Sequence, residues 1–319
     1  MSVLAKAHFY DEKAAFEHVE SILWPDGPVC PHCGCVERIY KLEGVRTKPS
    51  KKNPDGIERF GLKKCGDCRK QFTVRKGTIF EESAIPLHKW LQAIHLMCSS
   101  KKGIFSNQLH RTLEITLKSA WFLSHRIREA MRNDDFTPLG GAGGIVEIDE
   151  TFTGKRDAHR GAKLDKRGGV WWKVPVLTLI DRKGTARSFV IDRATKANVL
   201  PILRENLDKE ARVITDDSSI YRELDREYMH AFVVHSRGEY GRGEITTNTV
   251  EGFFSIFKRG MKGVYQHCSE KHLHRYMAEY DFRYSNREKL GCDDKERAKR
   301  ALLSIVGRRL TYEGPAYQS

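Results

Sequence analysis

The chain has 319 residues, of which 31% are charged and 39% hydrophobic, with a formal net charge of +14 at pH 7. This composition excludes a disordered chain, and the length allows two or three small domains. The longest apolar run, 174–180, is far too short to cross a bilayer, and residues 1–10 lack the apolar core of a secretory signal. We therefore expect a cytoplasmic or nucleoid-associated protein with no membrane partner. The positive surplus favours a polyanionic partner, although a merely soluble basic protein is the alternative.

The first third of the chain predicts helix, then irregular structure, then helix. Residues 1–29 predict one amphipathic helix to about Leu23, ended by Pro25 and Gly27. Residues 30–80 hold five cysteines among short β-like pieces, and apolar residues recur at helical spacing in 84–132. The Gly-rich stretch from Asn133 to Gly144 shows no periodicity, and we interpret it as a domain linker.

Two Cys-x-x-Cys pairs lie in the cysteine-rich region. The pairs are separated by 31 residues and comprise Cys30, Cys33, Cys65 and Cys68. Four thiolates spaced in this way can bind structural Zn²⁺ tetrahedrally, whereas a redox motif usually has one pair, and eight cysteines in a cytosolic chain argue against disulfides. The long spacer predicts a zinc ribbon with an inserted hairpin.

Basic residues surround this ribbon. Residues 36–80 contain 13 Lys and Arg against 5 Asp and Glu, with Phe60 and Phe72 among them. This favours contact with DNA over a purely structural module.

The following helices have helix-turn-helix spacing. We expect one helix from Ser106 to Leu113 and a second from Thr116 to about Arg132, with Ser119, Arg126 and Arg128 facing phosphates or bases. An ordinary helical hairpin is the alternative.

After the expected linker, the pattern changes to strands. We expect strands at 144–152, 171–180, 186–191, 212–216 and 231–235, and helices at 197–207 and from 247 to about 261. This order predicts an α/β fold with a mixed sheet and helices on both faces. Residues 294–310 predict a further basic helix.

Three acids lie at positions suited to chemistry. Asp149 is in the middle of the first strand, Asp216 closes another strand, and Glu251 begins a helix. An acid among apolar strand residues is costly unless it binds something, and such a cluster can hold two Mg²⁺ ions that activate the attacking oxygen and stabilise the leaving one. Singly, each acid could be a solvated surface group.

Alternatives remain for each acid. Glu147 and Glu150 alternate about Asp149, Asp217 competes with Asp216, and Asn248 lies three residues before Glu251 on nearly the same helical face.

Two basic residues follow the third acid. Lys258 and Arg259 come two helical turns after Glu251, on or near its side of the helix, where they could grip a DNA phosphate. A solvated helix face is the alternative.

Several motifs now resemble a known family. These are residues 147–154 (EIDETFTG), 214–221 (ITDDSSIY), 248–260 (NTVEGFFSIFKRG), the ribbon end 72–80 and the run 280–287. They resemble the DDE transposases of prokaryotic insertion sequences, in particular the group with a zinc ribbon and a short helix-turn-helix ahead of the catalytic domain. The resemblance covers roughly residues 20–290.

The resemblance implies a ribonuclease-H-like fold with a catalytic triad of Asp149, Asp216 and Glu251. It also implies Mg²⁺ or Mn²⁺ as catalytic metal and recognition of terminal inverted repeats. Some relatives use an Asn at the third position, which keeps Asn248 as an alternative. DNA contacts are further expected at 155–167 and 236–243.

Together these inferences predict five segments: helix and ribbon at 1–82, a helix-turn-helix-like domain at 83–133, a linker at 134–144, the catalytic domain at 145–290 and a basic helix at 291–319. The expected activity is cleavage of element ends and joining of the freed 3′-hydroxyl to target DNA. Because two ends must be paired, we expect a homodimer or higher oligomer on double-stranded DNA. A DNA-binding regulator derived from a transposase, and a purely hydrolytic nuclease of the same fold, are the rivals.

Overall fold

A computed structural model describes residues 2–51, 53–157, 172–239 and 241–311. The chain forms two compact units. The first comprises residues 1–100 and 105–130 together with the chain from Asp294 onward, and the second comprises 101–104 and 131–293. Most of the loop expected to contact DNA at 155–167, and the start of the strand expected at 171–180, lie outside the described residues.

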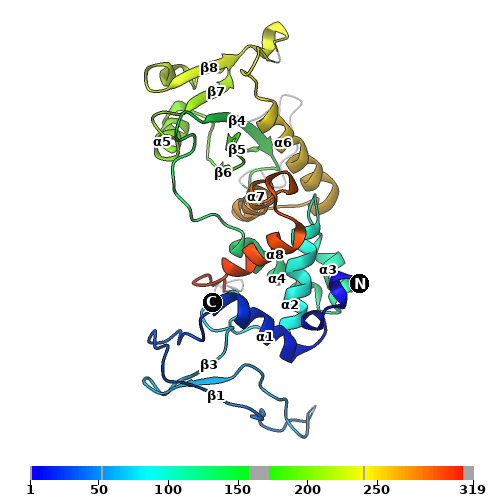
Figure 1. Ribbon diagram of the computed structural model, residues 1–319. Helices are drawn as coiled ribbons and strands as arrows, with labels where there is room; N and C mark the ends of the chain where they lie inside the picture. Colours follow the sequence, from blue (N-terminus) through cyan, green and yellow to red (C-terminus); the bar gives the residue numbers. More distant parts are fainter. Residues whose placement is uncertain (1, 52, 158–171, 240, 312–319) are drawn as a thin grey trace, which may run out of the picture. The chain divides into compact units, whose positions relative to one another are not determined.

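Helices form the centre of the first unit (Figure 1). They are α1 (Glu12–Leu23), α2 (Leu87–Ser99), α3 (Ser106–Leu113), α4 (Leu117–Ala130) and α8 (Asp294–Leu303). Helix α1 begins where the Asp11 carboxylate accepts a hydrogen bond from the Ala14 amide at 2.7 Å. Two 3₁₀ turns, Val3–Ala5 and Ala7–Phe9, precede it, so the prediction of one continuous N-terminal helix is wrong in its first third.

The last helix is shorter than predicted. Helix α8 ends at Leu303 instead of continuing to Leu310. Val306 forms an antiparallel bridge with Thr78, and Gly307 adopts a φ of +74°, which a right-handed helix cannot contain.

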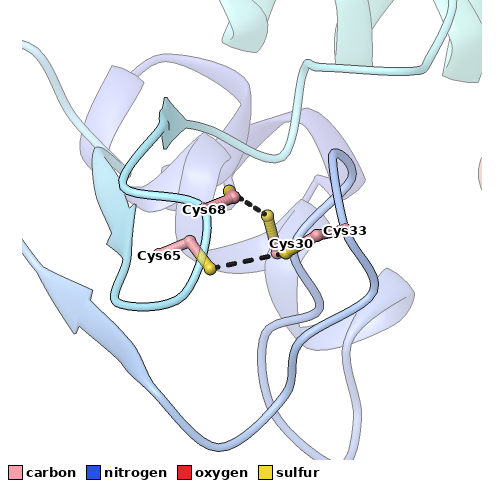
Figure 2. Close-up of side chains that lie close together, drawn as sticks. All are labelled: Cys30, Cys33, Cys65 and Cys68. Atoms are coloured by element: carbon pink, nitrogen blue, oxygen red, sulfur yellow. Dashed lines mark hydrogen bonds between the residues drawn. The ribbon is translucent and has the colours of Figure 1, made fainter.

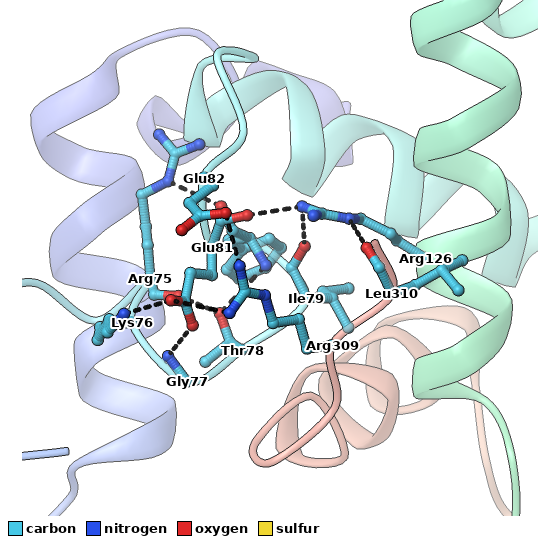
Figure 3. A network of polar contacts seen from close by, with 11 residues as sticks. Arg75, Lys76, Gly77, Thr78, Ile79, Glu81, Glu82, Arg126, Arg309 and Leu310 are labelled. Carbon is cyan, nitrogen blue, oxygen red and sulfur yellow. Dashed lines mark hydrogen bonds and ion pairs between the residues drawn. The ribbon is translucent and has the colours of Figure 1, made fainter. Parts of the chain in front are cut away.

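A polar network joins the C-terminal segment to the end of the ribbon region (Figure 3). The Arg126 guanidinium on α4 donates to the carbonyls of Ile79 and Glu81, both at 2.8 Å, and to that of Leu310 at 3.0 Å. Arg309 in turn forms an ion pair with Glu82 at 2.6 Å. The network therefore connects three segments that lie far apart in the sequence.

The ribbon is a small antiparallel sheet in the order β1 (Ile39–Lys41), β2 (Lys63–Cys65) and β3 (Gln71–Phe72). Between β1 and β2 the chain folds back on itself through an antiparallel bridge between Arg46 and Glu58. This segment is the inserted hairpin that the long cysteine spacer predicted.

The second unit contains a five-stranded sheet in the order β6-β5-β4-β7-β8 (Figure 1). Strands β4, β5 and β6 are antiparallel neighbours, while β7 and β8 run parallel to β4. The strands are β4 (Ile145–Thr153), β5 (Val174–Asp181), β6 (Ala186–Val190), β7 (Arg212–Asp216) and β8 (Met229–Val233). The order and directions are those of a ribonuclease-H-like fold, as predicted.

Helices cover both faces of this sheet (Figure 1). Helix α5 (Lys196–Asn206) packs with Val146 and Ile148 of β4 in one apolar core. Helices α6 (Asn248–Gly260) and α7 (Glu270–Ser285) form the other core against β5 and β6. A π-helical turn, η7 (Met261–Tyr265), follows α6 directly.

Close approach explains one glycine in α6. A Cβ on Gly260 would lie 1.7 Å from the Tyr280 hydroxyl, which donates to the Lys102 carbonyl at 2.9 Å. Only a residue without a side chain fits there.

The expected linker is folded in its second half. Leu139 is buried and pairs with Leu207, and the Gly140 amide donates to the Asp181 carboxylate at 3.2 Å. Residues 139–144 therefore belong to the second unit, and the prediction of a free linker is wrong for them. Gly140 is needed for close packing, since a Cβ at this position would lie 2.5 Å from that of Ala211.

Candidate active site and zinc centre

Four cysteines converge in the ribbon, two from each Cys-x-x-Cys pair (Figure 2). The sulfur atoms of Cys30, Cys33, Cys65 and Cys68 all lie within 4.8 Å of one another. The closest pairs are Cys30 with Cys68 at 3.7 Å and Cys33 with Cys65 at 3.6 Å. A tetrahedral zinc site with Zn–S bonds of about 2.3 Å places its sulfurs about 3.8 Å apart. The cluster therefore has the donor set and spacing of a structural Zn²⁺ site.

The backbone around the cluster favours thiolates. The backbone N–H groups of Cys68 and Asp67 donate to the Cys65 sulfur and lower the pKa of its thiol to about 6. This is the N–H arrangement that the tight Cys-x-x-Cys turns provide.

The helix pair is present, but two of its predicted DNA contacts are wrong. Arg126 and Arg128 are buried, at 5% and 1% exposure, and their guanidinium groups bind protein atoms. Arg126 binds the backbone carbonyls described above, and Arg128 donates to the Ser124 hydroxyl at 3.0 Å. Neither side chain has a surface to present to a phosphate, so both stabilise the first unit instead.

Within α4, the exposed part is the start of the helix. Thr116 caps this helix by accepting a hydrogen bond from the Ser119 amide at 3.1 Å, and Leu117 and Lys118 next to it are exposed. If the pair contacts DNA, this end is the available one, because recognition helices present their N-terminal residues to the bases.

In the second unit, the parallel pairing of β4 and β7 brings two predicted acids together. The last paired position is Glu147 with Ile214, and Asp149 and Asp216 lie two residues further along these strands. Alternate residues of a strand share a face, so both acids lie on the face of Glu147. Helix α6 covers that face. Ile180 of β5 is the partner of Glu147 in the sheet and shares its face, and it lies in the core formed with α6 and α7.

The third predicted acid projects from the first turn of α6. The Glu251 carboxylate accepts a hydrogen bond from the Thr247 hydroxyl at 2.7 Å and lies 3.5 Å from the His235 Nε2 atom. His235 begins the 3₁₀ turn that follows β8, the strand next to β7, which ends at Asp216.

The electrostatics show that these groups share one neighbourhood. Burial, with smaller contributions from the charges of Asp216 and Glu251, raises the pKa of Asp149 to about 7, while the Glu150 amide and His235 oppose the shift. Burial also raises the pKa of Asp216. Among the described residues, however, only the four cysteines form a group of three or more possible ligands whose atoms all lie within 4.8 Å of one another, so the three carboxylates form a more open group.

The competing acids differ in position. Asp217 is exposed and lies beyond the end of β7, whereas Asp216 is partly buried and accepts a hydrogen bond from the Ser218 amide at 3.1 Å. Asn248, the first residue of α6, and Glu251 are both exposed, so the proximity of Glu251 to His235 at 3.5 Å, and not burial, favours Glu251. Glu150 lies on the opposite face of β4, where burial raises its pKa to about 7. These placements favour Asp149, Asp216 and Glu251 as the group that shares one site.

Sequence reasoning missed His235. The residue lies in a short polar stretch with no regular spacing to any acid, so only the parallel pairing of β7 with β8 shows that it lies near them. Glu147 was treated as an alternative surface acid, but it is fully buried.

Lys258 and Arg259 are both exposed at the far end of α6. Lys258 lines a cavity of about 290 Å³ together with Lys155, Lys262 and Glu270. Three lysines against one carboxylate give the lining a surplus of positive charge, which suits a phosphate.

Comparison with known proteins identifies two family domains in this chain. Residues 10–71 match the transposase zinc-ribbon domain, and residues 141–285 match the ISXO2-like transposase domain. The ribbon and the ribonuclease-H-like sheet therefore define a transposase of the DDE class. Within that class, the chain belongs to the zinc-ribbon group of insertion-sequence transposases.

A curated relative agrees with this assignment. The chain is 29% identical over 265 residues to an uncharacterized protein in transposable element ISH50 of Halobacterium salinarum, covering 79% of this chain and 83% of the relative. A solved structure, a pre-cleavage Mos1 transpososome, is similar over 67% of this chain and 74% of that chain, with 13% identity and a TM-score of 0.28. A TM-score this low does not equate individual residues. Within the described part of the chain, no helix is long and apolar enough to cross a membrane.

Proposed function

We propose that this transposase binds the ends of its element, cleaves them and joins the freed 3′-hydroxyl to target DNA at a site formed by Asp149, Asp216 and Glu251. The observation that carries the proposal is the convergence of these acids: two neighbouring parallel strands and the first turn of one helix bring them to the same face of the sheet. Both reactions are phosphoryl transfers, so one site serves both without a covalent protein intermediate.

The donor set fits divalent cations. Oxygen ligands from carboxylates are those that Mg²⁺ and Mn²⁺ prefer, and a bound cation would offset the burial and the neighbouring charges that raise the pKa of Asp149. When bound, the metal activates the attacking oxygen and stabilises the leaving one. Asp149, Asp216 and Glu251 are the residues that would hold it.

The chain's own residues position the DNA. The exposed Lys258 and Arg259, with Lys155 and Lys262 at the same cavity, form the surface that grips the phosphates of the reacting strand. The ribbon and the exposed start of α4 are the candidates for recognising the inverted repeats. Pairing of two ends requires at least a dimer on the DNA, and the expected location is the nucleoid.

The critical experiment replaces Asp149 or Asp216 with Ala in the full chain. Each variant should still bind a labelled inverted-repeat duplex, whereas cleavage and strand transfer should fall by at least about 10³-fold, because metal-supported stabilisation of the transition state is worth several kcal/mol. Asp217→Ala is the matched control, since it removes an exposed neighbouring acid and should retain activity.

The same assay separates the rivals. Retained strand transfer in the Asp149 or Asp216 variant would refute the site. Wild-type protein that binds but never cuts would indicate a DNA-binding regulator, and cutting without joining of a precut end would indicate a hydrolytic nuclease.

A further inference from the structure

Glu147 is a buried carboxylate at the centre of the second unit, two residues before Asp149 on the same face of β4. Its side chain is fully buried, with 0% exposure. A charged group in such a place is costly unless hydrogen bonds satisfy it, so its partners reveal its role.

Glu147 binds the first turn of α6. One carboxylate oxygen accepts hydrogen bonds from the amides of Thr249 at 2.7 Å and Val250 at 3.1 Å, and the other accepts one from the Thr249 hydroxyl at 2.7 Å. These amides belong to the second and third residues of the helix, which are the amides that an N-cap side chain ordinarily satisfies. The negative charge also suits the positive end of the helix dipole.

The residue at the N-cap position does something else. Thr247 makes no capping hydrogen bond to a backbone amide of its own helix, and its hydroxyl instead donates to the Glu251 carboxylate at 2.7 Å. Glu147 of β4 therefore caps the helix, and Thr247 at the N-cap position binds Glu251 instead.

Arg182 completes the arrangement from the turn between β5 and β6. Its Nε donates to Glu147 at 2.7 Å, and its terminal nitrogen donates to the Thr246 carbonyl at 3.1 Å. The Arg182 amide also donates to the Ile145 carbonyl of β4 at 2.9 Å. One guanidinium thus neutralises Glu147 and fixes the chain that leads into α6.

From these contacts we infer that Glu147 is a positioning residue: together with Arg182 it locks the first turn of α6 to β4 and so sets where Glu251 stands relative to Asp149. Both acids are close in sequence to the residues that make this contact. Asp149 is two residues after Glu147, and Glu251 directly follows Val250. This inference rests on the proposed function, because it assumes that Asp149 and Glu251 act together on divalent metal.

The test compares two buried carboxylates by metal binding. Glu147→Gln keeps the shape of the side chain but loses the charge and places an amide NH₂ among donors. The full-length variant should bind Mn²⁺, measured by calorimetry without DNA, about 10- to 100-fold more weakly than wild type, the usual cost of losing a partner that orients metal ligands. The Mg²⁺ concentration for half-maximal cleavage should rise in parallel.

Asp281→Asn is the matched control. Asp281 on α7 is also buried and accepts hydrogen bonds from the amide and hydroxyl of Ser188, at 2.8 and 2.6 Å, but these tie α7 to β6 and not α6 to β4. It should lose thermal stability as Glu147→Gln does and keep wild-type Mn²⁺ affinity. Thr249→Val, which removes a single hydroxyl, tests the same contact if Glu147→Gln does not fold, and it should weaken Mn²⁺ binding to a smaller degree.

The outcomes distinguish the positioning role of Glu147 from the proposed function. Wild-type Mn²⁺ affinity in a folded Glu147→Gln or Thr249→Val protein, or an equal loss of Mn²⁺ affinity in Asp281→Asn, overturns the positioning role. The proposed function still stands in that case if the wild-type protein cleaves DNA. Wild-type protein that neither binds Mn²⁺ nor cuts DNA overturns the proposed function itself.

Discussion

The two candidate metal centres of this transposase are built on opposite principles. In the ribbon, four sulfurs lie within 4.8 Å of one another, two from each of two short turns. In the second unit, three carboxylates come from two strands and a helix and remain further apart, and burial, together with the charges of the other two acids, raises the pKa of Asp149. The ribbon cluster has four protein ligands close together, as structural zinc sites do, whereas the three carboxylates of the proposed active site are more widely spaced.

This difference indicates how far each region can fold without its metal. The ribbon has short strands and a small core, so its fold depends on the cation. The catalytic unit has two large apolar cores and folds around its acids, which oppose one another until a cation or proton arrives. Metal should therefore stabilise the ribbon by creating its fold, and the acidic cluster by neutralising carboxylates that are partly buried and close to one another.

The largest expected effect is at the ribbon. Replacing Cys65 with Ser should remove the bound zinc and unfold the ribbon, because structural zinc contributes about 10 kcal/mol or more in isolated zinc-finger peptides. Zinc content per chain, together with limited proteolysis of residues 30–80, measures this outcome.

The nearby Cys35 sharpens that comparison. Cys35 is partly buried near the cluster but is outside the group of four. Cys35→Ser should keep one zinc per chain and a protected ribbon, and loss of zinc in this variant would contradict the assigned ligand set.

A smaller effect, of opposite sign, is expected at the acidic cluster. The folded-state pKa of Asp149 is about 7, above its ordinary value of 3.8, so the folded protein binds more protons than the unfolded chain between these values. The free energy of unfolding should therefore fall as the pH rises through that window. Asp149→Asn should stabilise the metal-free protein at pH 8 by about 2 kcal/mol, a figure discounted because part of the side chain is exposed.

Denaturant unfolding in magnesium-free buffer measures this difference, without a chelator so that the ribbon keeps its zinc. The advantage of Asp149→Asn should shrink toward pH 4, where the wild-type side chain is also neutral. Asp217→Asn, at the exposed neighbour, should match wild type at both pH values, and a pH-independent gain in Asp149→Asn would argue against the buried charge of Asp149 as its cause.

The smallest predicted effect distinguishes surface basic residues from buried ones. Lys258→Ala should lower the slope of log affinity for DNA against log salt by about one unit, the loss of one phosphate contact. Arg126→Lys should leave that slope unchanged, because Arg126 binds backbone carbonyls inside the first unit. Equal changes in slope for the two variants would contradict the burial of Arg126 in the DNA-bound protein.

Some elements could be predicted to the residue. Strand β7 (Arg212–Asp216) and helix α3 (Ser106–Leu113) match their predicted bounds, because apolar spacing and end residues agree at both ends. The zinc cluster could also be predicted, because each Cys-x-x-Cys motif is recognised from four neighbouring residues.

Other features depend on contacts that a sequence does not show. Helix α7 was not predicted because its buried face includes Glu279, Asp281 and Arg283, which break the apolar pattern. The sequence likewise could not show that the Arg126 guanidinium donates its hydrogen bonds to carbonyls 45 or more residues away. Nor could it show that Glu147, which resembles a surface acid, caps a helix about 100 residues later.

The first unit is assembled from both ends of the chain, and this has a consequence for biosynthesis. Arg297 on α8 donates to the Cys98 carbonyl at the end of α2 at 2.8 Å, and Ile305 beyond it is fully buried. A ribosome delivers these residues only after the whole catalytic unit has emerged. The nascent ribbon and its helices must therefore wait, with part of their apolar surface uncovered, while the sheet between them folds first. A message cut short before codon 294 would yield a catalytic unit joined to an unfinished DNA-recognition half.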